Sequence, residues 1–470
     1  MSRNFYIAIF SLSLFLSIYL FHKSIDLYFF QDDFFEINIS DANNMSRYLS
    51  FFKFRDDIIA YRPITLQNYF FVSGELFGLN PAGFRLVTFV FFLADAFLIS
   101  KVIAKITQNS KVGLMTASLW LTSAIHFMAL SWIAAAYNIL GTFFWLLTAY
   151  LYLKFQQSKK GIFFLFSFLA YLLAIGSFEF SITWPIIFAA YSFVILKNKP
   201  GTIIKHFSPF VAVTVLYLIL RLLLIKVPQI EEYKIALNLD SVKALFWYFL
   251  WTFNIPEEFK KQIINNLIFF RERFLIDYWF LVSVSSIGAL WTVVLAIGVP
   301  LYRNYKREIS VKWKFILFCL FWFAVGISPV LLLPNHNFAM YLTLSSIGIY
   351  MLIAYLLVKN SQRAILIFSF VLFVLSSAFT VRFYYNNSWI FESQKFARNF
   401  ATGVLQTYPN LPANSVVLYE VPERENRQAL LFSNALRAVY NDASLTIYYN
   451  KSELVRDIQQ GMNRPVYIYP

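Results

Sequence analysis

The chain has 470 residues, of which 59% are hydrophobic, 20% aromatic and only 14% charged. Soluble globular domains are about one quarter charged, so this composition is typical of an integral membrane protein. In a soluble protein the formal net charge of +15 would suggest a nucleic-acid partner. Here the basic residues concentrate in short loops between apolar segments. We therefore expect them to set the orientation of the chain in the membrane, and we expect no nucleic-acid partner.

The apolar segments predict eleven membrane spans. Each is long enough for a helix to cross about 30 Å of hydrocarbon, although the third to the sixth are joined by very short turns. No small-residue cleavage site follows the first span, so we interpret it as a retained signal anchor. The expected spans are residues 5–22, 83–104, 112–130, 134–153, 161–178, 180–197, 207–226, 277–301, 313–334, 338–358 and 363–381.

The basic residues alternate with the spans in a way that predicts the orientation of the chain. Loops on one side carry Lys101 and Lys105 after the second span and Arg303 and Lys306 after the eighth, with almost no acid. The loop over residues 23–82 instead holds eight acidic and five basic residues. Because positive loops face the cytoplasm, we expect the N-terminus inside and this acidic loop, together with the C-terminus, outside.

Two outer loops are long, at residues 23–82 and 227–276, and their mixed apolar and charged patterning predicts short interfacial helices, including one over residues 260–274.

After residue 381 strands and helices alternate, which predicts a small parallel sheet with covering helices. The predicted fold class is therefore mostly α: a polytopic transmembrane helix bundle over residues 1–381 and a small extracytoplasmic α/β domain over residues 382–470. This second domain has no Gly-rich phosphate loop, so we expect a structural or acceptor-binding role. Its expected strands are residues 415–421, 445–449 and 465–469, and its expected helices are 428–440 and 452–460.

Two adjacent carboxylates, Asp32 and Asp33, follow the first span between two pairs of phenylalanines. They would lie at the membrane–water boundary, where partial desolvation and a neighbouring like charge raise the pKa of a carboxylate toward the range useful for a base. Aromatic residues at this depth are also ordinary interfacial anchors, and the pair can equally be the solvated start of a loop.

Four further ionisable residues fall on the same predicted side of the membrane. Arg62 lies in the first outer loop, His126 near the outer end of the third span, Glu179 between the fifth and sixth spans, and His336 between the ninth and tenth. Ionisable groups beside membrane segments are functional candidates. Each also has a structural interpretation, since histidines and acids cap helix ends and an arginine before a proline can belong to a turn. A guanidinium suits a phosphate as well as a carboxylate.

The sequence carries no soluble hydrolase signature and no nucleotide-binding loop. Its four scattered histidines and one cysteine, Cys319, are too few for a strong metal site. We expect no cofactor, with a divalent ion left open. A transporter would place polar groups near the midplane of the bilayer, where Asp95 is the main example here. Two classes of function therefore remain: an enzyme at the outer face, and a polytopic envelope transporter or non-catalytic scaffold.

Six short motifs occur in order along residues 1–381. They are Asp32-Asp33, Tyr61-Arg62-Pro63-Ile64-Thr65, Gly78-Leu79-Asn80-Pro81-Ala82-Gly83-Phe84, His126 with Trp132-Ile133-Ala134, Phe178-Glu179-Phe180-Ser181, and Tyr341-Leu342 with Ser346-Ile347-Gly348. In this order and topology they resemble the GT-C membrane glycosyltransferases, and within them the protein O-mannosyltransferases and the tetratricopeptide-bearing O-mannosyltransferase group. The chain has no tetratricopeptide repeats, so the resemblance concerns the membrane part alone.

The resemblance implies a GT-C-like fold and transfer of a sugar, with inversion, from a polyprenyl-phosphate-linked donor to a hydroxyl of a protein, an envelope glycan or a lipid. It places this reaction on the non-cytoplasmic face of the bacterial cytoplasmic membrane, or of the ER membrane in a eukaryote. It implies Asp32 as the catalytic base with Asp33 beside it in a positioning role. Arg62 and His336 would bind the donor phosphate, and His126 and Glu179 the substrate.

The chain also departs from the family pattern at several charged positions, and these departures leave the sugar open and remove one expected phosphate-binding arginine. Ala135, Ala136 and Asn138 stand where the pattern has Gly-Arg and Asp, Ala339 and Met340 stand where it has Glu-Arg, and Arg85, Thr88 and Phe92 stand where it has His, Asn and His.

Overall fold

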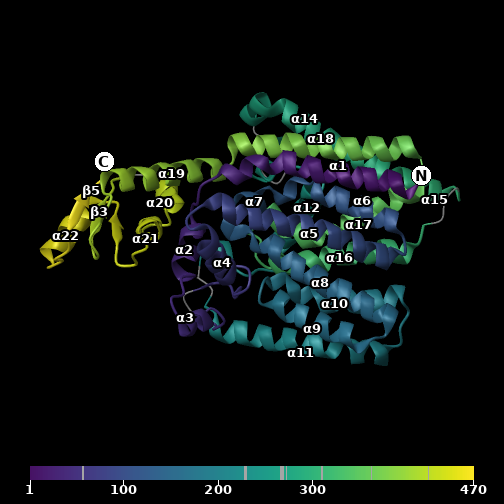
Figure 1. Ribbon diagram of the computed structural model, residues 1–470. Helices are drawn as coiled ribbons and strands as arrows, with labels where there is room; N and C mark the ends of the chain where they lie inside the picture. The colour runs from purple at the N-terminus through teal and green to yellow at the C-terminus, as the bar shows by residue number, and fades with distance from the viewer. Residues whose placement is uncertain are drawn as a thin grey trace.

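The computed structural model describes residues 1–55, 58–226, 230–264, 269–270, 272–307, 311–360, 362–421 and 423–469. Among these residues, eight helices are long and apolar enough to cross a membrane, and a ninth span is made if one bent pair of helices is counted together. The long apolar helices run side by side in a bundle, and a small region of strands and short helices lies at one end of it (Figure 1). The predicted mostly α membrane bundle with a small C-terminal region of strands and helices is confirmed. The eight spans are Arg3–Asp26, Pro81–Thr107, Ile133–Ser158, Pro200–Leu224, Ile276–Tyr305, Trp313–Leu331, Ala339–Lys359 and Arg363–Asn387.

The remaining three of the eleven predicted spans are helical but are not single long helices. The third is broken into α6 (Ser110–Leu121) and the pair η2–α7 (Ala124–Ser131), which meet at an angle of 52°. The fifth, α9 (Gly161–Ile175), is short, and the sixth consists of η4 (Glu179–Thr183), α10 (Trp184–Ala190) and η5 (Tyr191–Ile195). Helix α10 carries Pro185 in its first turn, where the missing N–H of proline does no harm.

Local sequence signals set the ends of the helices that carry the bundle. Helix α5 (Pro81–Thr107) begins with proline in its first turn, and the Asn80 side chain accepts a hydrogen bond from the Ala82 N–H at 3.1 Å. Helix α5 packs against α6 and α8 (Tyr137–Ser158), while α16 (Trp313–Leu331) packs against α17 (Leu342–Asn360). Gly113 of α6 lies so close to the backbone of α5 that a Cβ there would stand 2.2 Å from the Ser100 carbonyl oxygen. A residue without a side chain is therefore what allows these two helices to touch.

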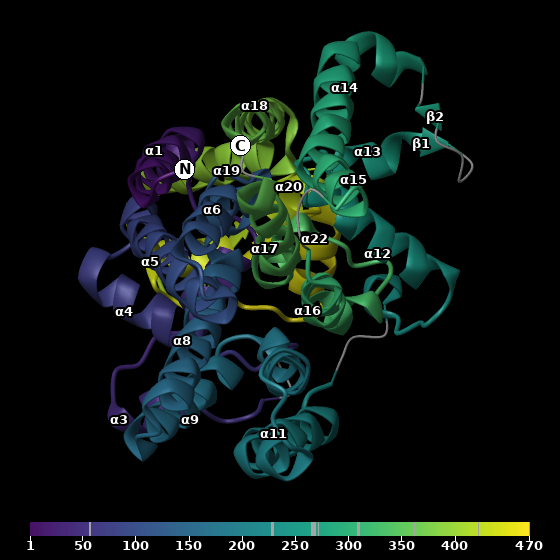
Figure 2. The same ribbon diagram turned by 90° about the vertical axis from the view of Figure 1, so that its right-hand side faces the viewer.

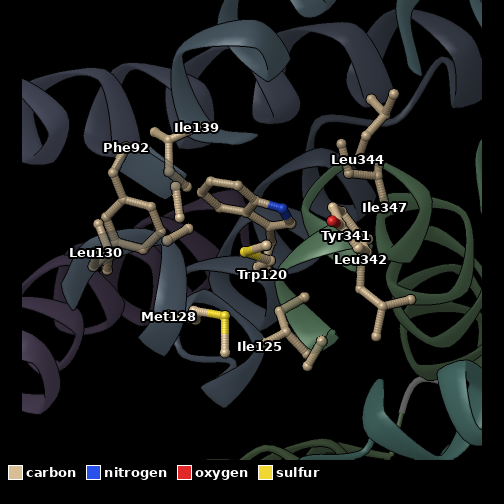
Figure 3. Packing of buried hydrophobic residues seen from close by; sticks show 14 of the residues in the cluster. Phe92, Trp120, Ile125, Met128, Leu130, Ile139, Tyr341, Leu342, Leu344 and Ile347 are labelled. Atoms are coloured by element: carbon tan, nitrogen blue, oxygen red, sulfur yellow. The ribbon is translucent and has the colours of Figure 1, made fainter. Parts of the chain in front are cut away.

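The centre of the bundle is packed with apolar side chains around Trp120. Figure 3 shows this indole between Phe92 and Ile139 on one side and Leu344 and Ile347 on the other. The Trp120 Nε1–H donates to the Thr343 carbonyl oxygen at 2.8 Å, which satisfies the one polar atom of the ring.

The outer peripheral helices α1 (Arg3–Phe21), α18 (Arg363–Asn387) and α11 (Pro200–Leu224) surround this centre in the view of Figure 2. Exposed leucines and valines on α11 and α18 face outward, as expected for helices that meet lipid. Helix α14 (Glu272–Val293) packs against α18 and completes this side of the bundle.

The C-terminal region contains the three predicted strands in a parallel sheet. Strands β3 (Val416–Leu418), β4 (Thr446–Tyr448) and β5 (Val466–Ile468) pair in the order β4-β3-β5. The predicted helix over 428–440 is divided into α20 (Arg424–Ala429) and α21 (Asn434–Tyr440), and α22 (Lys451–Gln459) follows β4. Helix α18 continues to Asn387 and is followed by α19 (Trp389–Thr407), a helix that the sequence does not predict.

The two long loops contain the expected short helices with one correction. The first loop holds α2 (Asp32–Ile39), α3 (Met45–Ser50) and α4 (Gln67–Phe77), and the second holds α12 (Leu239–Trp251). The helix predicted over residues 260–274 is wrong, because α13 (Glu258–Gln262) gives way to an antiparallel pair, β1 (Ile263–Ile264) with β2 (Phe269–Phe270). Isoleucine and phenylalanine favour strands, which explains the difference. Residues 265–268 and 271 of that prediction lie outside the described residues.

Candidate functional site: an acid-bearing turn at one end of the bundle

The two predicted acids open helix α2 at the end of the bundle that also carries α3, α4 and the C-terminal region (Figure 1). The residue before them, Gln31, has φ 50° and ψ −125°, a conformation that favours glycine. Such strain is of order 1–3 kcal/mol and persists only where the surrounding structure enforces it. The strained turn directs Asp32 and Asp33 into the first turn of α2, where the helix dipole favours negative charge.

Asp33 is fully buried and is held by two backbone N–H groups. Its Oδ1 accepts a hydrogen bond from Ala134 N at 2.6 Å, and its Oδ2 accepts one from Phe30 N at 3.2 Å. Burial raises the pKa of Asp33 to about 7, although the Arg85 guanidinium and both backbone donors act in the opposite direction. With both oxygens engaged, Asp33 ties the turn to the start of the span Ile133–Ser158.

Arg85 of helix α5 binds the same turn through hydrogen bonds to backbone carbonyl oxygens. Its guanidinium is 1% exposed and donates to the carbonyl oxygens of Tyr28 at 3.2 Å and Ser131 at 3.0 Å, and also to that of Leu27. A buried charge is tolerated only when its donors are satisfied, as they are here. Arg85 was one of the departures from the family pattern, and its contacts identify it as a brace for the acid-bearing turn.

Asp32 differs from Asp33 in its access to water. Its side chain keeps contact with solvent, although the surrounding protein removes enough water to raise its pKa to about 6, against the lowering effect of the Arg62 charge. One helical turn later, Glu36 is buried with its Oε2 unpaired among the described residues, and burial followed by the charge of Asp32 raises its pKa to about 8. At neutral pH Asp32 is therefore mostly ionised while Glu36 retains its proton.

Arg62, whose charge acts on Asp32, belongs to a cluster of two arginines and one acid. The Arg62 Nε lies 2.9 Å from Glu179 Oε2, and the Arg221 Nη1 lies 3.8 Å from Glu179 Oε1. The Arg62 guanidinium also stacks on Tyr137, with 3.5 Å between its Cζ and the ring centroid. Two cations share one carboxylate, so the cluster carries a surplus positive charge. The Arg221 side chain is 28% exposed, which leaves it open to an anion.

The loop that carries Arg62 is fixed to the turn that carries Glu179. Ile64 N donates to the Gly176 carbonyl oxygen at 3.1 Å, and Thr65 Oγ1 donates to that of Ser177 at 2.5 Å. These bonds join segments that are more than one hundred residues apart in the sequence, and they set the register in which the guanidinium meets its carboxylate.

His336 joins this cluster through aromatic neighbours. Its ring centroid lies 4.9 Å from that of Tyr233 and 5.9 Å from that of Tyr341. Burial, followed by the charge of Arg62, lowers the pKa of His336 to about 4. The imidazole is therefore neutral at physiological pH, so it can offer one hydrogen bond to a bound group but no positive charge.

His126 lies apart from these residues in the packed centre of the bundle. Its Nε2 is 2.9 Å from the Trp120 carbonyl oxygen, and its ring centroid is 4.2 Å from that of Trp120 and 5.1 Å from that of Phe92. These are contacts of a core residue, and they lend no support to the prediction that His126 binds substrate. Of the six predicted residues, the structure thus gathers Asp32, Asp33, Arg62, Glu179 and His336 at one end of the bundle.

The structure adds Glu36, Arg221 and Tyr137 to the site. Glu36 follows Asp32 by four residues, so a helix predicted at this point of the first loop would place both acids on one face. The sequence indicates Arg221 less clearly. It is an arginine at the end of an apolar span, on the same predicted side of the membrane as the acid-rich first loop. Among the described residues, no group of three or more histidines, cysteines or acids is arranged to hold a metal ion.

The fold and the site define an integral membrane protein with ionisable groups gathered at one end of a helical bundle. No family model matches the chain, and no curated protein matches it. Solved structures with a similar arrangement include an oligosaccharyltransferase from Archaeoglobus fulgidus in its apo form, with a TM-score of 0.48, 11% identity and coverage of 96% of this chain. The chain spans about 65% of the length of that oligosaccharyltransferase chain.

A second similar structure is ArnT from Cupriavidus metallidurans bound to undecaprenyl phosphate. It has a TM-score of 0.47 and 11% identity, and the match covers 99% of this chain and 90% of that one. Both neighbours are GT-C membrane glycosyltransferases, and at these scores the likeness describes the arrangement of helices alone.

Proposed function

We propose that the chain is a membrane glycosyltransferase that moves a sugar from a polyprenyl-phosphate carrier to an acceptor hydroxyl, with inversion at the anomeric carbon. The observation that carries this proposal is the pairing of Asp32, a solvent-accessible carboxylate with a pKa near 6, with a cluster of surplus positive charge around Arg62. The sequence motifs that contain these two residues, and the family they resemble, give the same assignment.

The chemistry needs one base and one anion site. The acceptor oxygen attacks the anomeric carbon while the bond from that carbon to the phosphate oxygen breaks, and Asp32 takes the proton of the acceptor hydroxyl. The carrier phosphate leaves with the electron pair of the broken bond and requires little protonation. Arg62 and Arg221 stabilise the charge that develops on it, because charge-assisted hydrogen bonds from a fixed guanidinium are strong in a partly dry site.

The other residues have supporting roles in this proposal. Asp33 has both oxygens engaged by backbone N–H groups, so its role is to position Asp32. Glu179 orients Arg62 and thereby acts on the donor through the arginine. Neutral His336 contributes a hydrogen bond beside the phosphate or the sugar. The reaction would take place on the non-cytoplasmic face, which the distribution of basic residues among the loops favours for the acid-bearing turn.

The test is reconstitution of the purified chain in vesicles with a polyprenyl-phosphate-linked hexose and a set of hydroxyl acceptors. Transfer of the labelled sugar to a protein, glycan or lipid acceptor is the expected result. Movement of the intact carrier or of a solute across the vesicle membrane, with no sugar transferred, would replace the proposal with the transporter alternative.

A further inference from the structure

The segment that carries the acids is held from two sides by parts of the chain that are distant in sequence. On the membrane side, Arg85 and the Ala134 N–H bind it, as described above. On the other side lies the C-terminal region, whose helix α21 packs against α2 (Figure 1). The acid-bearing turn is therefore sandwiched between the bundle and the C-terminal region.

The contacts from the C-terminal region reach the segment at four points along its length. They are Arg398 donating to the Asp26 carbonyl oxygen, Tyr28 N donating to Gln394 Oε1 at 3.1 Å, Gln31 N donating to the Ala429 carbonyl oxygen at 2.8 Å, and Asn38 Nδ2 donating to both the carbonyl oxygen and Oδ1 of Asn434 at 3.0 Å. These contacts come from three different elements, α19, α20 and α21, and they bracket Asp32 and Asp33 on both sides.

One of the four contacts falls on the strained residue itself. Gln31 has a positive φ and directly precedes Asp32, so a change in its backbone would rotate the start of α2 and both carboxylates with it. A non-glycine residue keeps such a conformation only when its neighbours enforce it. The Ala429 carbonyl oxygen, which accepts from the Gln31 N–H, is the contact that meets this requirement from the C-terminal side.

We propose that the C-terminal region, residues 389–469, positions the acid-bearing turn, and that Asn434 and Ala429 are positioning residues for Asp32. This inference rests on the proposed function for its catalytic consequence. Its structural part, that the C-terminal region enforces the conformation of residues 27–38, stands on the hydrogen bonds alone. The C-terminal region then forms the wall of the site opposite the bundle, where an acceptor approaching from water would meet it.

The experiment compares three variants of the full chain in vesicles. Asn38→Ala removes both hydrogen bonds to Asn434 without touching an acid. The second variant adds Gln31→Gly to Asn38→Ala. Glycine adopts the positive φ without strain and keeps the N–H donor. Asn450→Ala, at the N-cap of α22, is the matched control, because its side chain accepts from Ser452 N within the C-terminal region.

Hydrogen exchange of the amides in residues 27–36 is the first readout. The loss of two hydrogen bonds predicts exchange faster by roughly tenfold or more in Asn38→Ala and unchanged in Asn450→Ala. Adding Gln31→Gly should bring the exchange rate back toward that of the parent. Unchanged exchange in Asn38→Ala, or no recovery on adding Gln31→Gly, would overturn the inference.

Sugar transfer is the second readout and separates this inference from the proposed function. A misplaced base lowers kcat, so Asn38→Ala should reduce kcat by roughly tenfold while the KM for the carrier stays unchanged, because Arg62 and Arg221 remain in place. If the parent chain transfers no sugar but Asn38→Ala still shows faster exchange, the proposed function fails and the structural inference stands. If transfer is normal in Asn38→Ala, the positioning role is wrong.

Discussion

Two places in the chain put polar residues beside apolar helices, one at the break between α6 and η2 and one after the first span, and they differ in how those residues are satisfied. At the break between α6 and η2, the Asn254 Oδ1 accepts from both Ser123 Oγ at 3.0 Å and Ala124 N at 2.9 Å, and Tyr350 Oη donates to Ser123 Oγ at 2.8 Å. At the acid-bearing turn, Asp32 keeps access to solvent and Glu36 Oε2 has no partner among the described residues.

Polarity inside a membrane bundle therefore does not by itself mark a site. The break at Ser123 is closed, because buried polar atoms from three segments pair with one another and stabilise a bend. The turn at Asp32 is open, and its polar groups carry perturbed pKa values together with a surplus of charge nearby. Open, incompletely paired groups are the ones that can still bind or react.

Replacement of Arg85 should produce the largest effect on stability. Arg85→Met leaves the buried carbonyl oxygens of Leu27, Tyr28 and Ser131 without this donor, and each unsatisfied group costs about 1–3 kcal/mol. We expect the free energy of unfolding in detergent to fall by at least about 3 kcal/mol, or the variant to fail to accumulate. Lys101→Met, an exposed position of the same helix, is the control. A variant as stable as the parent would refute the role of Arg85 as a brace.

Opening the closed break should cost less and should leave the chemistry intact. Asn254→Ala removes the acceptor shared by Ser123 and Ala124, so we expect a loss of about 1–3 kcal/mol in stability. The folded fraction of this variant should transfer sugar at the parental rate, measured per folded molecule. A large loss of transfer with unchanged stability would mean that the break at Ser123 belongs to the site.

Removal of either arginine from the cluster should weaken carrier binding more than it disturbs folding. Arg62→Ala and Arg221→Ala each delete a charge-assisted contact, so a loss of roughly tenfold or greater in the affinity for a polyprenyl-phosphate analogue is expected. Arg273→Ala is the matched control, since the Arg273 side chain is 95% exposed and its ion-pair partner Asp277 lies four residues away. Equal affinities in all three variants would remove the cluster from the donor site.

The pH dependence of stability tests the protonation state of Glu36. The folded state holds a proton on Glu36, whose pKa rises from 4.5 to about 8, while the unfolded chain has released that proton. Stability therefore falls as the pH rises between these two values, and Glu36→Gln should flatten this part of the profile. Thermal melting of the two proteins from pH 5 to 8 checks the prediction. Parallel profiles would show that Glu36 is ionised in the folded state.

The sequence could predict what depends on local patterns. The apolar segments, the three C-terminal strands and the position of the acids after the first span all follow from composition and periodicity. The contacts that fix the backbone beside Asp32 and assemble the arginine cluster could not be predicted. They join Gln31 to Ala429 and Glu179 to Arg221, which are far apart in the sequence. His126 was selected as a polar residue near a span end, and only its packing against Trp120 shows that it belongs to the core.

The central claim is that Asp32 accepts the proton of the acceptor hydroxyl, and the most direct test compares Asp32→Asn with Asp33→Asn in a sugar-transfer assay. Asparagine keeps the size of the side chain and removes the proton acceptor, so Asp32→Asn should lower kcat by at least roughly a hundredfold while donor binding is kept. Asp33→Asn should do less, and the parent should lose activity as the pH falls through about 6, the pKa of Asp32. Near-normal transfer by Asp32→Asn would contradict the account.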